Sequence, residues 1–188
     1  MGASSTVWPA EVIIGSKATS SWVAKNQPVE VDFISVNQQQ QLQPNTPIKI
    51  IGQMVRYESH RKRTLGGYYS YDTKTIKEPV AVNCGSQTDA QGHLRCQFNF
   101  AKAGELELTA ISTDKAGRQA ATHTSLWVAG DDEWWFEQGD DDRIDILADK
   151  KDYKVGDVAR LQVRMPFREA TALVSVVRDG ILESFVTP

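Results

Sequence analysis

The sequence predicts an all-β protein made of antiparallel β-sandwiches. Along most of the chain, apolar residues recur at every second position, which is the period of a strand that buries one face. Short motifs that contain Asp and Gly separate these apolar runs and favour tight turns. No window of a dozen residues has the 3.6-residue period of an amphipathic helix. Together these observations favour many short strands that pack as sandwiches.

Individual strands follow from the alternation. The apolar residues at 29, 31 and 33 alternate with Glu30 and Asp32. A second alternating run covers residues 105–110, and a third covers 144–148. Residues 158–163 continue the pattern less regularly, and one short strand is predicted ahead of all these, at 12–14. Each of these runs is typical of a half-buried strand.

Turn motifs join neighbouring strands. Asp179-Gly180 lies between two β-branched runs, and Asp-Gly in that setting favours a β-hairpin. Residues 88–92 (Thr-Asp-Ala-Gln-Gly) and 113–117 (Thr-Asp-Lys-Ala-Gly) share one arrangement. In each, the Asp side chain can accept hydrogen bonds from the local backbone, and the Gly can adopt a positive φ. We therefore predict tight turns at all three places.

A chain of 188 residues can hold one large domain or two small ones. We interpret residues 1–21 as a tag remnant and the trailing strand of a preceding domain, and residues 22–130 as a complete sandwich. Residues 131–142 are predicted to be an acidic aromatic linker. Residues 143–188 contain only about four predicted strands, which is too few for a closed sandwich, so we expect them to be an incomplete domain.

Charge and motifs exclude several classes of function. A net charge of −3 gives no general attraction to nucleic acid, and no apolar run reaches the roughly 18 residues of a membrane span. His60, His93 and His123 are scattered, without Cys or carboxylate at metal-ligand spacing. Gly-x-Ser-x-Gly, His-Glu-x-x-His and phosphate-loop motifs are missing. We therefore expect no catalytic, cofactor-binding or metal-binding residues, and a protein that is not an enzyme.

Cys84 and Cys96 flank the predicted turn at 88–92. If the apolar runs 80–84 and 94–100 are strands that meet at this turn, the two cysteines can reach the separation that a disulfide needs. A bridge that closes so short a loop stabilises by roughly 2–3 kcal/mol. It also indicates a compartment outside the reducing cytosol. The alternative is a pair of buried free thiols.

Trp134, Trp135 and Phe136 lie inside the acidic stretch 131–142. The acidic residues lack the fixed spacing and the turn glycine of an EF-hand, so we interpret them as a solvated linker. The three aromatic residues are predicted to anchor this linker in a groove between domains, or to contact a partner.

Residues 56–63 contain a basic cluster, and residues 68–71 are rich in tyrosine. Basic residues beside tyrosines can bind RNA or polysaccharide. We expect instead a mobile charged loop between strands. An alternative function is a carbohydrate- or peptidoglycan-binding sandwich that uses Trp134, Trp135 and the tyrosines.

Several motifs in combination resemble one family. Residues 22–29 (Trp-Val-Ala-Lys-Asn-Gln-Pro-Val), followed by a strand, resemble the opening of a macroglobulin domain in bacterial α2-macroglobulins. Four further segments are similar to the rest of that domain. They are the cysteine-flanked turn, Ala103-Gly104-Glu105-Leu106, residues 114–118 and Trp127-Val128-Ala129-Gly130. Residues 148–159 resemble the family's Asp-Lys-x-x-Tyr-x-x-Gly-Asp strand pair, and Met165-Pro166-Phe167 and residues 172–180 continue the resemblance.

The resemblance implies a function without catalysis. It implies that the chain is a scaffold segment, covering two consecutive macroglobulin-like domains, of a periplasmic endopeptidase inhibitor of broad range. Such a protein is usually an inner-membrane lipoprotein and guards the cell envelope. It traps a protease after its bait region has been cleaved. Residues 143–188 resemble the start of the domain that carries this bait region. The implied partners are target endopeptidases, through the full-length protein, neighbouring domains of the chain, and a penicillin-binding-type peptidoglycan synthase.

The trapping chemistry of the family is not expected in this chain. The family's thioester motif is Cys-x-Glu-Gln. Glu137-Gln138 is preceded by Trp135 where the Cys would stand, and Cys84-Gly85-Ser86-Gln87 has Ser86 in place of the Glu. Neither sequence can form the thioester, and the lipidated N-terminal Cys is also not found. The resemblance therefore implies positioning of other parts of the inhibitor.

Overall fold

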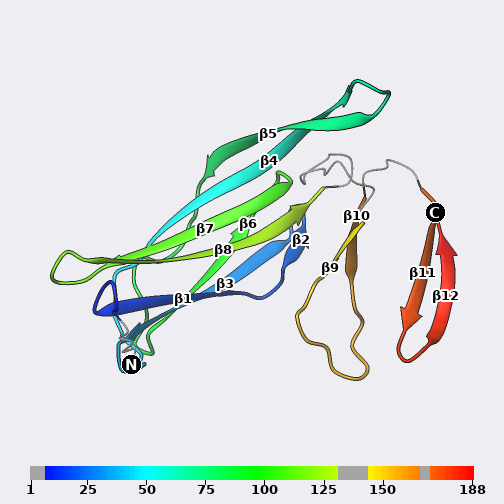
Figure 1. Ribbon diagram of the computed structural model, residues 1–188. Helices are drawn as coiled ribbons and strands as arrows, with labels where there is room; N and C mark the ends of the chain where they lie inside the picture. The colour runs from blue at the N-terminus through cyan, green and yellow to red at the C-terminus, as the bar shows by residue number, and fades with distance from the viewer. Residues whose placement is uncertain (1–6, 131–143, 166–169) are drawn as a thin grey trace, which may run out of the picture.

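A computed structural model describes residues 7–130, 144–165 and 170–188 (Figure 1). These residues form twelve β-strands and no helix, and all but one of the strand pairings are antiparallel. The predicted all-β, antiparallel fold class is therefore confirmed. Within the described residues there is accordingly no helix with the length and apolar character required to cross a membrane.

Eight strands form two sheets that face each other (Figure 1). The three-stranded sheet has the order β1-β3-β6, with β1 at Val12–Ala18, β3 at Pro28–Asn37 and β6 at His93–Asn99. The five-stranded sheet has the order β2-β8-β7-β4-β5, with β2 at Trp22–Ala24, β4 at Lys49–Arg63, β5 at Tyr69–Val80, β7 at Gly104–Thr113 and β8 at Gln119–Ala129. The short strand β2 pairs in parallel with β8.

The alternating residues of both sheets build one hydrophobic core. Phe33 of β3 is fully buried, and so is Leu106 of β7 on the opposite sheet. The buried cluster draws residues from β1, β3, β6, β4, β7 and β8, all of them between Ala10 and Val128. Burial of this apolar surface is the main force that holds the two sheets together. The alternation predicted at 29–33 and 105–110 is thus the inward face of a sandwich.

The strand predicted at 12–14 does not trail from a preceding domain. β1 is longer, and it pairs with β3 in an unbroken antiparallel register from Val12↔Asn37 to Ala18↔Val31. Val12 and Ile14 are buried in the same core as Phe33. The sandwich therefore begins near residue 10, and the boundary expected at residue 22 cuts through it. The mistake arose because a strand's partner strand cannot be read from the strand's own pattern.

The turns at 88–92 and 113–117 are built alike, as predicted. In each, the Asp side chain accepts backbone N–H groups from two and four residues further on, at 2.9 Å. Gly92 and Gly117 have φ values of +77° and +80°, which favour glycine. The His93 backbone N–H is the main cause that lowers the pKa of Asp89. At Asp114 burial opposes the shift, but backbone and Arg118 donors still lower the pKa.

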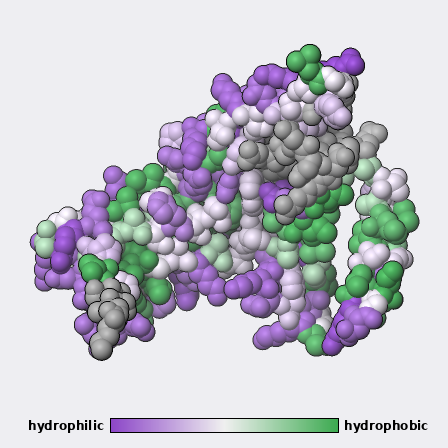
Figure 2. Space-filling model, viewed as in Figure 1, coloured by the Kyte–Doolittle hydropathy of each residue, from purple (hydrophilic) through white to green (hydrophobic). Residues whose placement is uncertain are grey.

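The remaining four strands form two separate hairpins. β9 (Asp145–Ala148) pairs with β10 (Leu161–Arg164), and β11 (Ala172–Val177) pairs with β12 (Ile181–Thr187). The predicted Asp179-Gly180 turn joins β11 to β12, and both of its residues have positive φ. None of the described residues after 143 is buried. Figure 2 shows hydrophobic residues gathered on the surface of both hairpins.

Candidate functional site

The three histidines of the sequence lie on three different strands. His60 lies on β4, His93 at the start of β6 and His123 on β8. The Nδ1 atom of His123 is 2.9 Å from the hydroxyl of Thr109, a cross-strand contact. Within the part of the chain that the structure describes, no three His, Cys, Asp or Glu side chains group closely enough to hold a metal ion. Several contacts fix one segment of the described chain to another.

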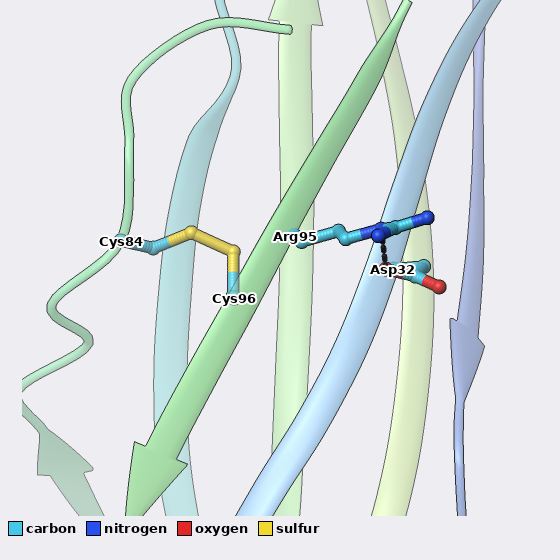
Figure 3. The surroundings of a disulfide bond; sticks show 4 residues. All are labelled: Asp32, Cys84, Arg95 and Cys96. Atoms are coloured by element: carbon cyan, nitrogen blue, oxygen red, sulfur yellow. Dashed lines mark ion pairs between the residues drawn. A yellow bond between two sulfur atoms is a disulfide. The ribbon is translucent and has the colours of Figure 1, made fainter. Parts of the chain in front are cut away.

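The disulfide between Cys84 and Cys96 is one such contact (Figure 3). Cys96 is buried on β6, and the two Cα atoms are 5.3 Å apart. The two strands predicted to meet at the turn do not pair, because residues 81–84 are not a strand and β6 pairs with β3. The bridge therefore joins β6 to the connection that crosses over from the five-stranded sheet, rather than joining two strands of one hairpin.

Further bonds hold the same crossover connection. The backbone N–H of Ile48 donates to the carbonyl of Ser86 at 2.8 Å. Thr88 is buried, and its hydroxyl accepts from the Thr46 N–H and donates to the Gln43 carbonyl, both at 2.9 Å. The disulfide is thus the covalent part of a larger anchor. This anchor ties the end of the five-stranded sheet to the edge strand of the three-stranded sheet.

The Asp-Lys-x-x-Tyr-x-x-Gly-Asp motif forms the loop between β9 and β10. The Tyr153 hydroxyl donates to Asp149 Oδ1, and the Lys154 N–H donates to Asp157 Oδ2 at 3.1 Å. Gly156 has a φ of +94°, in the region that favours glycine. The Tyr153 hydrogen bond is the main cause that lowers the pKa of Asp149. The motif residues therefore shape a loop, and the bonds that they make are local.

The β9–β10 hairpin contacts the sandwich through a cation–π pair that the sequence did not reveal. The guanidinium of Arg164 on β10 lies 4.8 Å from the ring centroid of Trp127 on β8. Trp127 also packs beside Tyr57, with ring centroids 6.4 Å apart. At the other end of the hairpin, the carbonyl of Ala148 accepts a hydrogen bond from the hydroxyl of Ser21. Two contacts thus fix β9–β10 against the β2–β8 edge of the sheet.

A groove of ≈860 Å³ lies between the hairpin and the sandwich. Its walls are mostly hydroxyl, ammonium and carboxylate side chains, with residues 17–21 and Ser125 on one side and residues 149–152 on the other. The contacts of Arg164 with Trp127 and of Ser21 with Ala148 connect the two sides of this groove.

Two predicted sites have different outcomes. Trp134, Trp135, Phe136 and the whole linker 131–142 lie outside the described residues. The basic cluster at 56–63 lies on strand β4, and the tyrosine-rich stretch leads into β5, so the prediction of a charged loop is wrong. Twelve residues of each strand pair in one register, from Gly52↔Val80 to Arg63↔Tyr69.

Comparisons with known proteins agree with the motif resemblance. No family model matches the chain. The sequence is 24% identical, over 97% of its length, to an alpha-2-macroglobulin homolog of Nostoc sp., and it spans 9% of the length of that relative. Among solved structures, alpha-2-macroglobulins from E. coli and Salmonella align with 96% of the chain at 16% and 15% identity, with TM-scores of 0.48 and 0.46, and each match covers 12% of the solved chain. The relationship to bacterial α2-macroglobulins that the sequence motifs predicted is thus confirmed, and this chain is similar over nearly its whole length to a short part of such a protein.

Proposed function

We propose that this chain is a non-catalytic scaffold segment of a bacterial α2-macroglobulin, a broad-range endopeptidase inhibitor. The observation that supports this most strongly is the match to the Nostoc relative, which extends over 97% of the chain. The match covers the sandwich and both hairpins, so it does not depend on one motif. Trapping of proteases after bait-region cleavage belongs to the full-length protein. The role of this segment is to hold other parts of that protein in position.

The division into two macroglobulin-like units is part of the proposal. The first unit is the sandwich of residues 10–130, extended at its N-terminal side by β1. Residues 131–142 link it to the unit that starts at 143, and Trp134, Trp135 and Phe136 anchor that linker or contact a partner. Two contacts support a defined orientation of the second unit, namely Arg164 on Trp127 and Ser21 on the Ala148 carbonyl.

The proposed setting is the periplasm, with the full-length protein attached to the inner membrane by a lipid. The Cys84–Cys96 disulfide supports a compartment more oxidising than the cytosol. The proposed partners are target endopeptidases and a penicillin-binding-type peptidoglycan synthase.

An assay with a panel of endopeptidases tests the proposal. The full-length protein that contains this chain is expected to lose its activity as an inhibitor when its bait region is blocked. The 188-residue chain alone is expected neither to cleave a general protease substrate nor to inhibit the endopeptidases. Hydrolysis or inhibition by the isolated chain would contradict a scaffold role. Saturable changes in tryptophan fluorescence on titration with muropeptides would favour the alternative, a peptidoglycan-binding sandwich.

A further inference from the structure

The β4–β5 hairpin projects beyond the sandwich (Figure 1). The pairing of β4 with β7 ends at Val55↔Glu105, whereas its pairing with β5 continues to Arg63↔Tyr69. Within the described part of the chain, residues 56–76 therefore form a two-stranded ribbon that pairs with no third strand, and we call them the β4–β5 ribbon. Eight paired residues at about 3.3 Å per residue carry the tip roughly 26 Å past the last strand pairing of the sheet.

The tip of this ribbon presents apolar side chains to the solvent. The side chain of Leu65 is fully exposed, and Tyr68 is 76% exposed. The Thr64 N–H donates to the Tyr68 carbonyl at 2.7 Å, and the Thr64 hydroxyl donates to the same carbonyl at 3.1 Å. Gly66 and Gly67 have φ values of +89° and +86°, which close the turn. Hydrogen bonds between Thr64 and Tyr68 thus close the turn, and Leu65 is exposed at its tip.

The β4–β5 ribbon is positively charged, in contrast to the rest of the chain. It contains five Lys and Arg residues and two Asp and Glu residues, so its net charge is +3, whereas the whole chain carries −3. Lys62 forms an ion pair with Asp72 across the ribbon. Arg63, directly beside the tip, is exposed. Arg56, at the base of the ribbon, pairs with Glu78, so Arg63 is the exposed cation that lies next to the apolar tip.

We propose that the tip of the β4–β5 ribbon binds the surface of an anionic phospholipid bilayer. Leu65 would enter the boundary of the acyl chains, and Tyr68 would lie at the headgroup level, where amphipathic aromatic rings gather. Arg63, next to the tip, would then face lipid phosphates, which attract juxtamembrane basic residues.

The rest of the acidic chain does not prevent this contact. At physiological ionic strength the Debye length is about 8 Å, so charges roughly 26 Å from the tip are screened. A water-soluble polyanion such as RNA or a charged polysaccharide could pair with the cations, but it offers no apolar phase for the fully exposed aliphatic side chain of Leu65. The leucine at the tip is the reason that we favour a bilayer. This inference does not depend on the lipid anchor of the proposed function.

Co-sedimentation with vesicles tests the inference. The 188-residue chain is mixed with vesicles of phosphatidylglycerol and phosphatidylcholine in equal parts, or of phosphatidylcholine alone. We expect several-fold more bound chain on the anionic vesicles, and less as salt is raised. Leu65→Asp is expected to weaken binding to the anionic vesicles about tenfold. It should not change the thermal stability, because the Leu65 side chain is fully exposed. Arg63→Glu is expected to weaken binding to the anionic vesicles.

Leu42→Asp is the matched control, since Leu42 is a half-exposed leucine outside the ribbon, and it should bind like the wild type. Equal binding to neutral and anionic vesicles would overturn the proposal. Undiminished binding of Leu65→Asp would overturn it as well, since the tip would then not enter the bilayer. Binding to single-stranded RNA or an anionic polysaccharide that exceeds binding to the vesicles would assign the ribbon to a different partner and would also contradict it.

Discussion

Residues 10–129 and residues 144–188 share the same two-residue alternation of apolar and polar side chains, but only the first region buries its apolar residues. Phe33, on β3, is fully buried, whereas Phe185, on β12, is 48% exposed. The difference does not lie in the strands, because both regions form regular antiparallel pairs. It lies in the second layer, since β3 faces a five-stranded sheet, whereas each hairpin in 144–188 is a separate two-stranded sheet in which no described residue is buried. Isolated hairpins are at best marginally stable in water.

The comparison predicts that equal truncations have unequal effects. Phe33→Ala should lower the free energy of unfolding by about 3–5 kcal/mol, because it removes a fully buried ring from the core. Phe185→Ala should change it by less than about 0.5 kcal/mol, since a half-exposed side chain on β12 leaves no cavity. Urea denaturation followed by circular dichroism measures both. Comparable losses from the two variants would mean that β12 shares the core of the sandwich.

Removal of the disulfide should affect the sandwich next most strongly. The bridge closes a loop with a sequence separation of 12 and anchors the crossover to β6. Cys84→Ser together with Cys96→Ser should therefore cost roughly 2–3 kcal/mol by the chain-entropy estimate. Thermal denaturation of the double variant, and of the wild type with and without reductant, checks this. A double variant with wild-type stability would show that the hydrogen bonds of Thr88 and Ser86 are sufficient to hold the connection.

Loss of the Arg164–Trp127 contact should act on the hairpin and leave the sandwich intact. A cation–π pair is worth about 0.5–2 kcal/mol, so Arg164→Ala should speed hydrogen exchange in β10 by roughly 2- to 30-fold. The unfolding midpoint of the sandwich should not move. Arg160→Ala is the control, because the Arg160 side chain is exposed in the same hairpin. Equal acceleration by both variants would contradict a specific contact with Trp127.

Acid should weaken the sandwich through Asp89. Its pKa is lowered from the usual value of 3.8, mainly by the His93 backbone N–H and also by the Gln91 N–H. Because the folded pKa lies below the unfolded one, the contribution is complete above about 3.8 and is lost as the pH falls through the folded value. Asp89→Asn should flatten the fall in unfolding free energy below pH 4. Asp149→Asn should leave that slope unchanged, because Asp149 lies in the loop between β9 and β10. An equal change from both variants would mean that this loop and the sandwich unfold together.

The sequence predicted the parts of the fold in which burial alternates. The strands around Phe33 and Leu106 and the turn at Asp179-Gly180 were found because each carries its own local signal. The β4–β5 ribbon was mistaken for a loop, since both of its faces meet solvent and no apolar alternation marks it. The partner of β1, the crossover at Cys84 and the contact of Arg164 with Trp127 were missed for another reason. Each joins residues far apart along the chain, or depends on which sheet a strand enters.

Hydrogen exchange of the 188-residue chain, read strand by strand, tests most directly whether the sandwich alone carries the stable core. Amides of β3 and β7 should exchange only on global unfolding, because the residues of these strands face the shared core. Amides of β11 and β12 should exchange at least about 100-fold faster, since none of the described residues in that hairpin is buried. Equal protection of β12 and β3 would contradict the distinction between the two regions.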